Sequence, residues 1–284
     1  MKQLPMLIDA PSLDRLLRQD SPPLVIDCQA ALSDHAAGRK AWLAGHIPGA
    51  GHADLESDLS GAKTAETGRH PLPIPEDFRR FLADVGLTPE RPVVVYDDSG
   101  GAFAVRCWWL LRWFGHGQAA LLDGGLSAWR EHIDRLETGQ SETDPSDYTG
   151  TPNQMPVVNA DELQQGLEQD RLRLIDARGP VRFRGEEEPI DAVAGHIPGA
   201  VNLPFADNLD EQGRWKPVET LRERFVAALP PHEAGQAVHM CGSGVSACHN
   251  LFAMEYAGLK GSALYVGSWS EWIRDPSRPV ARGE

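Results

Sequence analysis

One cysteine and the glycine-rich segment after it are the residues in this sequence best suited to chemistry. Cys241 comes directly after the apolar-leaning run 237–240, and Gly-Ser-Gly-Val-Ser-Ala follows at 242–247. Apolar residues then recur at roughly helical spacing through 245–254, which predicts a helix. A cysteine between a strand and a helix lies among free backbone N–H groups at the positive helix end. We expect this environment to favour the nucleophilic thiolate and to suit an anionic group on the sulfur, as in a persulfide.

The overall composition predicts a globular protein and argues against some classes of partner. The chain has 284 residues, of which 41% are hydrophobic and 24% are charged, enough for one large domain or two ordinary ones. The formal net charge of -14 argues against nucleic acid or an anionic membrane as a partner, because both are bound by basic patches. A small anionic substrate stays possible, since one local arginine can outweigh the global sign.

The cysteines and the apolar segments indicate a reducing compartment. Residues 1–10 lack the basic and apolar parts of a signal peptide, and no apolar run approaches the length of a transmembrane helix. The spacing of the four cysteines matches neither a disulfide framework nor a CxxC zinc pattern. We therefore expect free thiols, a cytoplasmic location, no membrane contact, no metal and no cofactor.

The sequence repeats itself over most of its length. Gly-His-Ile-Pro-Gly-Ala occurs at 45–50 and again at 195–200. The surrounding segments repeat as the pairs 24–27 and 174–176, 93–97 and 237–241, and 121–129 and 264–272. A repeat of this length indicates two homologous domains rather than a solenoid. We expect an amino-terminal domain over 1–138, a polar, proline-containing linker over 139–156, and a carboxyl-terminal domain over 157–284.

Short β-rich runs alternate with helical patterns in each half. The apolar run 93–96 predicts a buried strand, and 103–114 predicts a helix that ends near Gly115. This alternation predicts an α/β fold in which each domain has a parallel sheet with helices on both faces. In such sheets the chemistry takes place beyond the carboxyl ends of the strands, and Cys241 stands at such an end.

With these motifs the chain resembles the rhodanese-like sulfurtransferases over nearly its whole length. The tandem arrangement is similar to the two-domain group that includes the rhodanese and 3-mercaptopyruvate branches, in which the amino-terminal copy is usually catalytically silent. In agreement, Asp97 stands in the first half where Cys241 stands in the second. The neutral pair Gly242 and Ser243 resembles the mercaptopyruvate branch, whereas the thiosulfate branch usually has basic residues at these two positions.

The resemblance implies that Cys241 takes a sulfur atom from a donor, holds it as a persulfide and passes it to an acceptor. Such covalent catalysis predicts ping-pong kinetics. The backbone N–H groups of the loop should point at the sulfur, so Gly242, Gly244, Val245 and Ser246 are expected to bind substrate. The expected donor is the small anion 3-mercaptopyruvate, which would leave as pyruvate. The expected acceptor is cyanide, a small thiol or thioredoxin.

Arginines are expected to hold the donor. The family places a substrate-carboxylate arginine at Arg182, and a bidentate arginine suits an α-keto acid. The mercaptopyruvate branch commonly has a second arginine shortly before Gly-His-Ile-Pro, where this chain has Glu-Pro-Ile-Asp-Ala-Val at 188–193. That departure keeps thiosulfate open as the alternative donor, and Arg69 could supply the missing positive charge. Arg178 and Arg184 are expected to be solvated charges.

A Ser–His–acid relay is also implied by the resemblance to the mercaptopyruvate branch. Its members here would be Ser243, His70 and an acid, either Glu56 or Asp58, of which we favour Glu56. The relay would move a proton onto the departing pyruvate enolate. The alternative is that His70 is an ordinary surface residue of its loop.

Other conspicuous residues are expected to be structural. His46 and His196 occur in both Gly-His-Ile-Pro motifs although only one half carries the cysteine, so a hydrogen bond common to both halves is the simpler role. The same argument applies to Asp27 and Asp176. The remaining cysteines and most tryptophans are expected in the core, namely Cys28, Cys107, Cys248, Trp108, Trp109, Trp113, Trp269 and Trp272.

Two other classes of function compete with sulfur transfer. A phosphatase on the same fold would need Cys-x5-Arg, so that the arginine binds the phosphoryl oxygens, but Ala247 stands at the arginine position. A non-enzymatic binding module is the other alternative, and the presence of Cys241 with its glycines argues against it.

Overall fold

Contacts within the chain divide it into two compact units. The computed structural model describes residues 4–141 and 143–284. Unit 1 consists of the chain up to Gly61, Pro73–Gln154 and Glu211–Trp215, and unit 2 consists of Ala62–Leu72, Met155–Asp210 and Lys216–Glu284. Each unit therefore includes a short segment from the opposite half of the sequence. The segment Ala62–Leu72, which carries Arg69 and His70, belongs to the unit that contains Cys241.

Most of the expected linker, 139–156, belongs to unit 1 by its contacts. The N–H of Ser146 donates to the carbonyl of Ala83 at 2.9 Å, and the N–H of Gln154 donates to the carbonyl of Trp113 at 3.0 Å. The contacts thus define units that are discontinuous along the chain, and the domain boundaries expected from the sequence stay a prediction.

The sheet of unit 1 has five parallel strands in the order β1-β5-β4-β2-β3. These strands are β1 (Leu7–Ile8), β2 (Leu24–Asp27), β3 (Gly51–His52), β4 (Val93–Tyr96) and β5 (Ala119–Leu122). The strands β2, β4 and β5 are buried along their whole length. Strands covered on both faces form continuous apolar runs rather than alternating ones, as the sequence has here.

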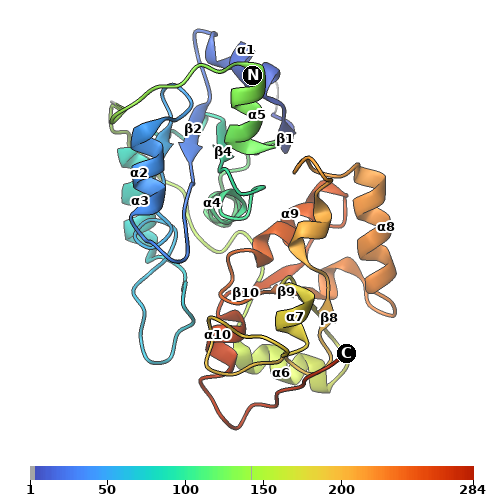
Figure 1. Cartoon of the computed structure of the whole chain (residues 1–284). Coiled ribbons are helices and arrows are strands. Elements are labelled where there is room, and N and C mark those ends of the chain that lie inside the picture. Colours follow the sequence, from blue (N-terminus) through green and yellow to red (C-terminus); the bar gives the residue numbers. More distant parts are fainter. Residues whose placement is uncertain (1–3, 142) are drawn as a thin grey trace. The chain divides into compact units, whose positions relative to one another are not determined.

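Helices cover both faces of this sheet (Figure 1). They are α1 (Ala10–Leu17), α2 (Ala37–Ala44), α3 (Pro75–Asp84), α4 (Ala104–Trp113) and α5 (Gly125–His132). On one face, Leu13 of α1 and Trp129 of α5 share a core cluster with Val25 of β2. The helix α4 is buried around nearly its whole circumference, Trp108 and Trp109 included, as is typical of a helix that is apolar all round.

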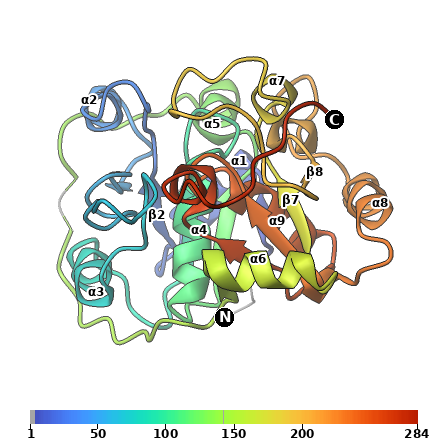
Figure 2. The same cartoon turned by 90° about the horizontal axis from the view of Figure 1, so that it is seen from below.

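Unit 2 repeats this topology with strand order β6-β10-β9-β7-β8, again all parallel. Its strands are β6 (Val157–Val158), β7 (Arg173–Asp176), β8 (Val201–Asn202), β9 (Ala237–Met240) and β10 (Ala263–Tyr265). Its helices are α6 (Ala160–Glu168), α7 (Pro180–Phe183), α8 (Val218–Ala228), α9 (Ala247–Tyr256) and α10 (Ser268–Trp272), with 3-10 turns at Phe205–Asn208 and Ala234–Gln236. The helix α6, seen from below in Figure 2, packs against this sheet through Leu163, which shares a core cluster with Leu174 and Trp269.

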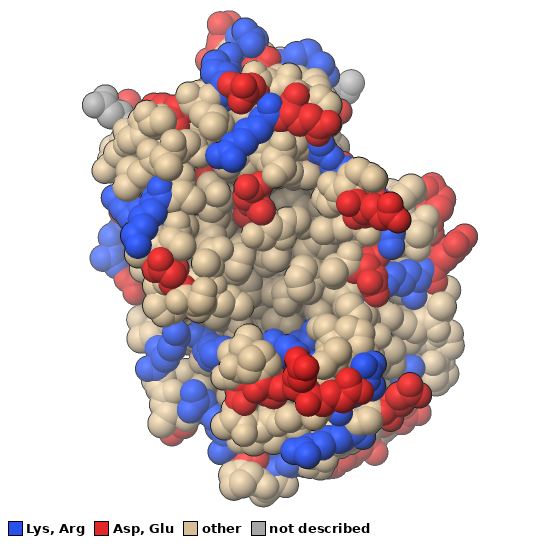
Figure 3. Space-filling view, viewed as in Figure 1, with Lys and Arg blue, Asp and Glu red and all other residues tan. Residues whose placement is uncertain are grey.

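Charged side chains of both signs are interspersed over the face of the molecule drawn in Figure 3. On this face the acidic excess therefore forms no single large patch. None of the helices in the described ranges is long and apolar enough to cross a membrane.

Candidate active site

Cys241 lies at the carboxyl end of β9, where its backbone is fixed by α10. Its N–H donates to the hydroxyl of Ser268 at 3.1 Å, and its carbonyl accepts from the N–H of Trp269 at 3.1 Å. The next carbonyl, that of Gly242, accepts from the N–H of Ser270 at 2.9 Å. The cysteine is only 2% exposed, so its sulfur sits in a rigid and largely desolvated position.

Two backbone N–H groups of the following loop donate to the sulfur. The N–H of Gly244 lies 3.2 Å from Sγ of Cys241, and that of Ser243 lies 3.5 Å away. Gly244 has φ of +79°, and a Cβ there would lie 2.2 Å from the carbonyl oxygen of Val266. Only glycine fits this turn, because an added side chain would collide with backbone and the left-handed conformation disfavours other residues.

The other loop residues expected to bind substrate lead into α9. The carbonyls of Val245 and Ser246 accept from the first turn of the helix, from the N–H groups of Cys248 and His249 at 3.1 Å each. Val245 is buried, while Ser246 is half-buried. Cys248 is buried inside the helix with its thiol toward the carbonyl of Gly244, at 3.5 Å, in a structural position.

The corresponding loop of unit 1 is filled by a carboxylate. Asp97 follows β4, as Cys241 follows β9, and its Oδ1 accepts from the N–H groups of Ser99 and Gly101 at 2.8 Å each. Its Oδ2 accepts from the N–H groups of Phe103 and Ala104 at 2.9 and 2.8 Å. Four converging N–H groups form an anion-binding concavity. In unit 1 the chain's own side chain occupies the position where unit 2 presents its sulfur.

His70 contacts the active-site loop. Its Nδ1 lies 2.7 Å from the hydroxyl oxygen of Ser243, and both residues are buried. The segment that carries it is held against α10, because the N–H of Arg69 donates to the hydroxyl of Ser270 at 3.0 Å. A Cβ on Gly68 would lie 2.5 Å from the carbonyl oxygen of Gly267, so the two backbones approach closely.

The two acids considered for the relay belong to unit 1. Glu56 lies beside His35, with 3.4 Å between Oε1 and Nδ1. Asp58 accepts from the N–H of Asp54 at 2.8 Å and from the hydroxyl of Ser57 at 3.2 Å. Burial raises the pKa of the Asp58 carboxyl above its usual value. The assignment of either acid to the relay stays a prediction.

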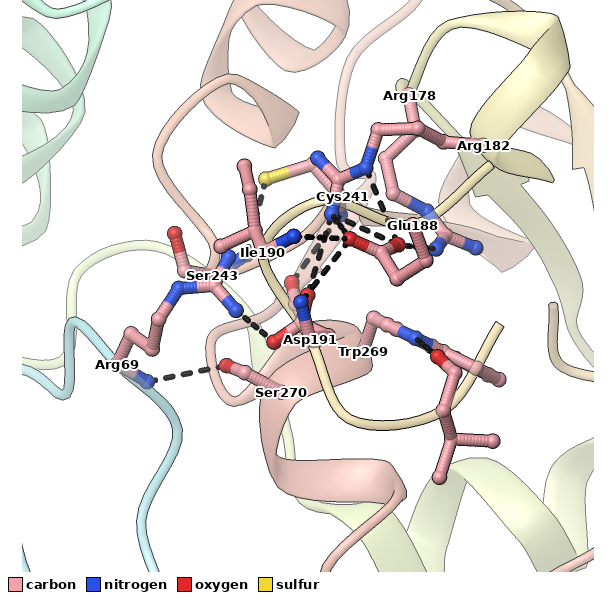
Figure 4. Close-up of polar contacts among 12 residues, drawn as sticks. Arg69, Arg178, Arg182, Glu188, Ile190, Asp191, Cys241, Ser243, Trp269 and Ser270 are labelled. Carbon is pink, nitrogen blue, oxygen red and sulfur yellow. Dashed lines mark hydrogen bonds and ion pairs between the residues drawn. The ribbon is translucent and has the colours of Figure 1, made fainter. Parts of the chain in front are cut away.

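Two arginines meet two carboxylates beside the loop (Figure 4). Arg182, on α7, donates to Glu188 at 2.7 Å through Nη2 and at 3.1 Å through Nε, and Nη2 also donates to Oδ2 of Asp191 at 3.1 Å. Arg69 donates through Nη1 to the other oxygen, Oδ1, of Asp191. Both carboxylates are buried, and each guanidinium is about a quarter exposed or less.

The lack of a side chain at Gly242 leaves space for the guanidinium groups of Arg69 and Arg182. A Cβ there would lie 2.8 Å from Nη2 of Arg69 and 3.5 Å from both terminal nitrogens of Arg182. The pair therefore lies directly beside the residue that follows Cys241. Burial lowers the pKa of the Arg69 guanidinium. A negative charge on Cys241 partly offsets this effect by raising the same pKa.

The expectation that Arg178 is a solvated charge is wrong. Arg178 is buried, donates through Nη2 and Nε to Oδ2 of Asp176 at 2.7 and 3.0 Å, and donates to the carbonyl of Gly195 at 2.8 Å. Its guanidinium also lies 4.8 Å from the ring centroid of Trp269. A buried carboxylate and an aromatic face offset the cost of desolvating the charge. Arg184 is partly exposed and pairs with Glu186 at 2.6 Å.

The histidines of the repeated motif make similar contacts in the two units. Nδ1 of His46 lies 2.7 Å from the carbonyl of Trp42, and Nδ1 of His196 lies 2.8 Å from the carbonyl of Phe183. Both rings are buried. The role expected from their occurrence in both copies, a structural hydrogen bond, agrees with this geometry.

Glu188 and Asp191 are the site residues that sequence analysis did not assign a role. Their only signal was the acidic segment in the place where a second arginine was expected. No group of histidine, cysteine or carboxylate side chains within the described ranges could hold a metal ion.

A model of the rhodanese-like domain matches the chain twice, over residues 9–132 and 159–275. The chain belongs to the rhodanese-like family. The expected tandem of α/β domains, each with a parallel sheet between helices, is thereby confirmed.

Relatives of the chain are named after two sulfur donors. A Pseudomonas aeruginosa protein named "Probable 3-mercaptopyruvate sulfurtransferase" is 51% identical over 92% of this chain and 93% of its own length. The "Thiosulfate sulfurtransferase" of Bos taurus is 33% identical over 87% of this chain and 84% of its own length. The solved structure of the 3-mercaptopyruvate sulfurtransferase from Leishmania major matches with a TM-score of 0.84 at 28% identity, over 96% of this chain and 76% of that one. The expected enzyme class, a sulfurtransferase that takes sulfur from a donor, is confirmed by these relatives.

Proposed function

We propose that this enzyme moves a sulfane sulfur from 3-mercaptopyruvate, through a persulfide on Cys241, to a thiophilic acceptor. The observation that carries the proposal is that the sulfur of Cys241 accepts hydrogen bonds from two loop N–H groups. The next residue, Gly242, lies beside the guanidinium groups of Arg69 and Arg182. The filled loop of unit 1 supports it, because four N–H groups of this type of loop converge on the carboxyl group of Asp97.

In the first half-reaction the Cys241 thiolate attacks the sulfur of the donor. A new S–S bond forms, the C–S bond of mercaptopyruvate breaks, and its electron pair stays on carbon as the enolate of pyruvate. The thiol proton of the donor stays with the transferred sulfur or goes to solvent. The N–H groups of Ser243 and Gly244 stabilise negative charge on the cysteine sulfur, and the loop is built to accept the charge of the persulfide.

The enolate needs a proton to become pyruvate. We assign its delivery to Ser243 and His70, whose short contact suits a proton transfer. Glu56 stays the acid we favour behind His70, with Asp58 as the alternative. Such a relay is of use with an α-keto acid donor but not with thiosulfate, which leaves as sulfite.

The donor carboxylate would be bound by Arg182 with Arg69. The two guanidinium groups lie beside Gly242, next in sequence to the nucleophile. In the second half-reaction an acceptor thiolate or cyanide attacks the outer sulfur, and the Cys241 thiolate leaves. Cyanide, a small thiol or thioredoxin fits this step, since each supplies a nucleophilic carbon or sulfur.

Intact mass spectrometry tests the proposal. Wild-type protein exposed to 3-mercaptopyruvate without acceptor is expected to gain about 32 Da, removable by reductant and located on Cys241. Cys241→Ser should gain nothing, whereas Cys248→Ala should gain the same mass as wild type, because Cys248 is a buried structural thiol. No gain in wild type, or a gain retained in Cys241→Ser, would refute the proposal.

The alternative donor, thiosulfate, is tested with cyanide as acceptor. We expect kcat/KM for 3-mercaptopyruvate to exceed that for thiosulfate by at least about tenfold, because two buried carboxylates next to the arginines disfavour a dianion. A preference for thiosulfate would favour the rhodanese alternative.

A further inference from the structure

Asp191 contacts both arginines of the site at once. Its Oδ1 accepts from Nη1 of Arg69, and its Oδ2 accepts from Nη2 of Arg182 at 3.1 Å. Arg69 comes from the segment 62–72, and Arg182 comes from α7. A single buried carboxylate is therefore the bridge between two guanidinium groups that lie far apart in the sequence.

The bridge leaves one terminal nitrogen of each arginine beside Gly242, the residue that follows the nucleophile. Nη2 of Arg69 and Nη1 of Arg182 lie 2.8 and 3.5 Å from the position of a Cβ on Gly242. In the described part of the chain, neither nitrogen has a hydrogen-bond partner of its own. Two such nitrogens on adjacent planar groups suit the two oxygens of a carboxylate.

The charges of this group are balanced before any donor binds. Arg69 and Arg182 carry two positive charges, and Glu188 and Asp191 carry two negative ones within hydrogen-bonding distance. The nearby Arg178 pairs with Asp176 and also lies 3.6 Å from Oε2 of Glu188, so with this pair included the positive and negative charges still balance. A donor that enters as an anion therefore adds uncompensated negative charge next to the Cys241 thiolate, and a dianion adds twice as much as a monoanion.

We propose that Asp191 is a positioning and donor-selecting residue, which joins Arg69 and Arg182 into one receptor for a singly charged carboxylate and disfavours dianions. The inference rests on the proposed function for its biological donor. The expected preference of the site for monoanions does not depend on the reaction, so it applies equally to ligands that do not react. It explains how the chain binds an α-keto acid without an arginine in 188–193.

The test measures binding of two unreactive probes by isothermal titration calorimetry. Pyruvate has the carboxylate of the α-keto acid donor, and sulfate has the shape and double charge of thiosulfate. In Asp191→Asn the ratio of pyruvate affinity to sulfate affinity is expected to fall about tenfold, because the lost charge favours the dianion more. In Asp191→Glu, which keeps the charge but displaces it, both affinities should fall while their ratio stays within about threefold of wild type.

A matched control removes the same charge from the same segment. Glu186 is exposed and pairs with Arg184, away from the arginine pair, so Glu186→Gln should leave both affinities unchanged. The proposal is overturned if Asp191→Asn leaves the ratio unchanged, or if Glu186→Gln shifts it as much. It is also overturned if Asp191→Glu changes the ratio as strongly as Asp191→Asn does.

The same variants separate this inference from the proposed function. With active enzyme, Asp191→Asn should lower the ratio of kcat/KM for 3-mercaptopyruvate over thiosulfate by a similar factor, mainly through KM. If wild type gains no sulfur from either donor, the proposed function fails, while the probe affinities still decide the role of Asp191.

Discussion

Nδ1 of His70 lies 2.7 Å from the hydroxyl oxygen of Ser243, although the two residues come from opposite halves of the sequence. Both belong to unit 2, because the segment 62–72 packs there. His70, for which an exposed loop position was the alternative, is therefore buried against the residue two positions after the nucleophile. The contact makes the role of His70 directly testable.

Loss of the His70 imidazole should affect the two donors differently. We expect His70→Ala to lower kcat with 3-mercaptopyruvate about a hundredfold, because only the enolate of that donor needs a proton. With thiosulfate the loss should be much smaller. Steady-state kinetics with cyanide as acceptor measures both values, and an equal loss with both donors would mean that His70 only holds the loop in place.

A methyl group on Gly242 should disturb the arginine pair. Its Cβ would lie 2.8 Å from Nη2 of Arg69, closer than such contacts normally come. We expect Gly242→Ala to lower kcat/KM for 3-mercaptopyruvate at least about tenfold, mostly through KM, because a displacement of about 1 Å weakens a positioned contact strongly. Gly235→Ala is the control, since no atom lies within 4 Å of its Cβ position. Unchanged KM in Gly242→Ala would contradict a substrate role for the pair.

Neutralising Asp97 should destabilise unit 1. An amide in Asp97→Asn cannot accept all four N–H groups that the carboxylate now satisfies, and its own NH2 group would face donors. We expect a loss of about 1–3 kcal/mol in the free energy of unfolding. Urea unfolding measures it, with Asp98→Asn as the control, because Asp98 is exposed and accepts a hydrogen bond from the hydroxyl of Ser127, which is exposed too. Equal stability of the two variants would contradict an anion-filled loop.

The free energy of unfolding should decrease as the pH is lowered, because of His239 in β9. Burial lowers the pKa of His239 from 6.5 to about 3, and neither ring nitrogen has a hydrogen-bond partner within the described ranges. Above pH 6.5 the His239 imidazole is neutral in both the folded and the unfolded chain, so it adds no pH dependence to the free energy of unfolding. Below that value only the unfolded chain takes up the proton, which lowers the free energy of unfolding by about 1.4 kcal/mol per pH unit down to about pH 3.

Replacing this histidine should remove that part of the acid sensitivity. At pH 5 we expect His239→Leu to be more stable than wild type by about 2 kcal/mol in addition to any difference at pH 7.5. Urea unfolding at the two pH values measures the change. His132→Leu, at an exposed position of α5, serves as the comparison variant. Parallel pH profiles of His239→Leu and wild type would show that the ring is not held neutral.

Most of the architecture could be predicted because it depends on residues that are close in sequence. The run 93–96 and the helix 103–114 correspond to β4 and α4, since buried strands and helices carry their own periodicity. The placement of Cys241 before a glycine turn and a helix could be predicted for the same reason, because it depends on neighbouring residues. Arg178 could not be placed, because its sequence shows a charge but not the buried Asp176 and Trp269 that surround it.

The two repeated domains, their parallel sheets and the cysteine at the end of a strand all follow from patterns that can be read along the chain. No such pattern places Arg69 and His70 in the unit of Cys241 or makes Asp191 bridge Arg69 to Arg182, because these arrangements depend on how the chain folds in three dimensions. The difference comes from the separation along the chain over which each kind of interaction acts. Periodicity and turn chemistry act between neighbours along the chain, whereas the pairing of buried charges depends on which distant segments folding brings into contact.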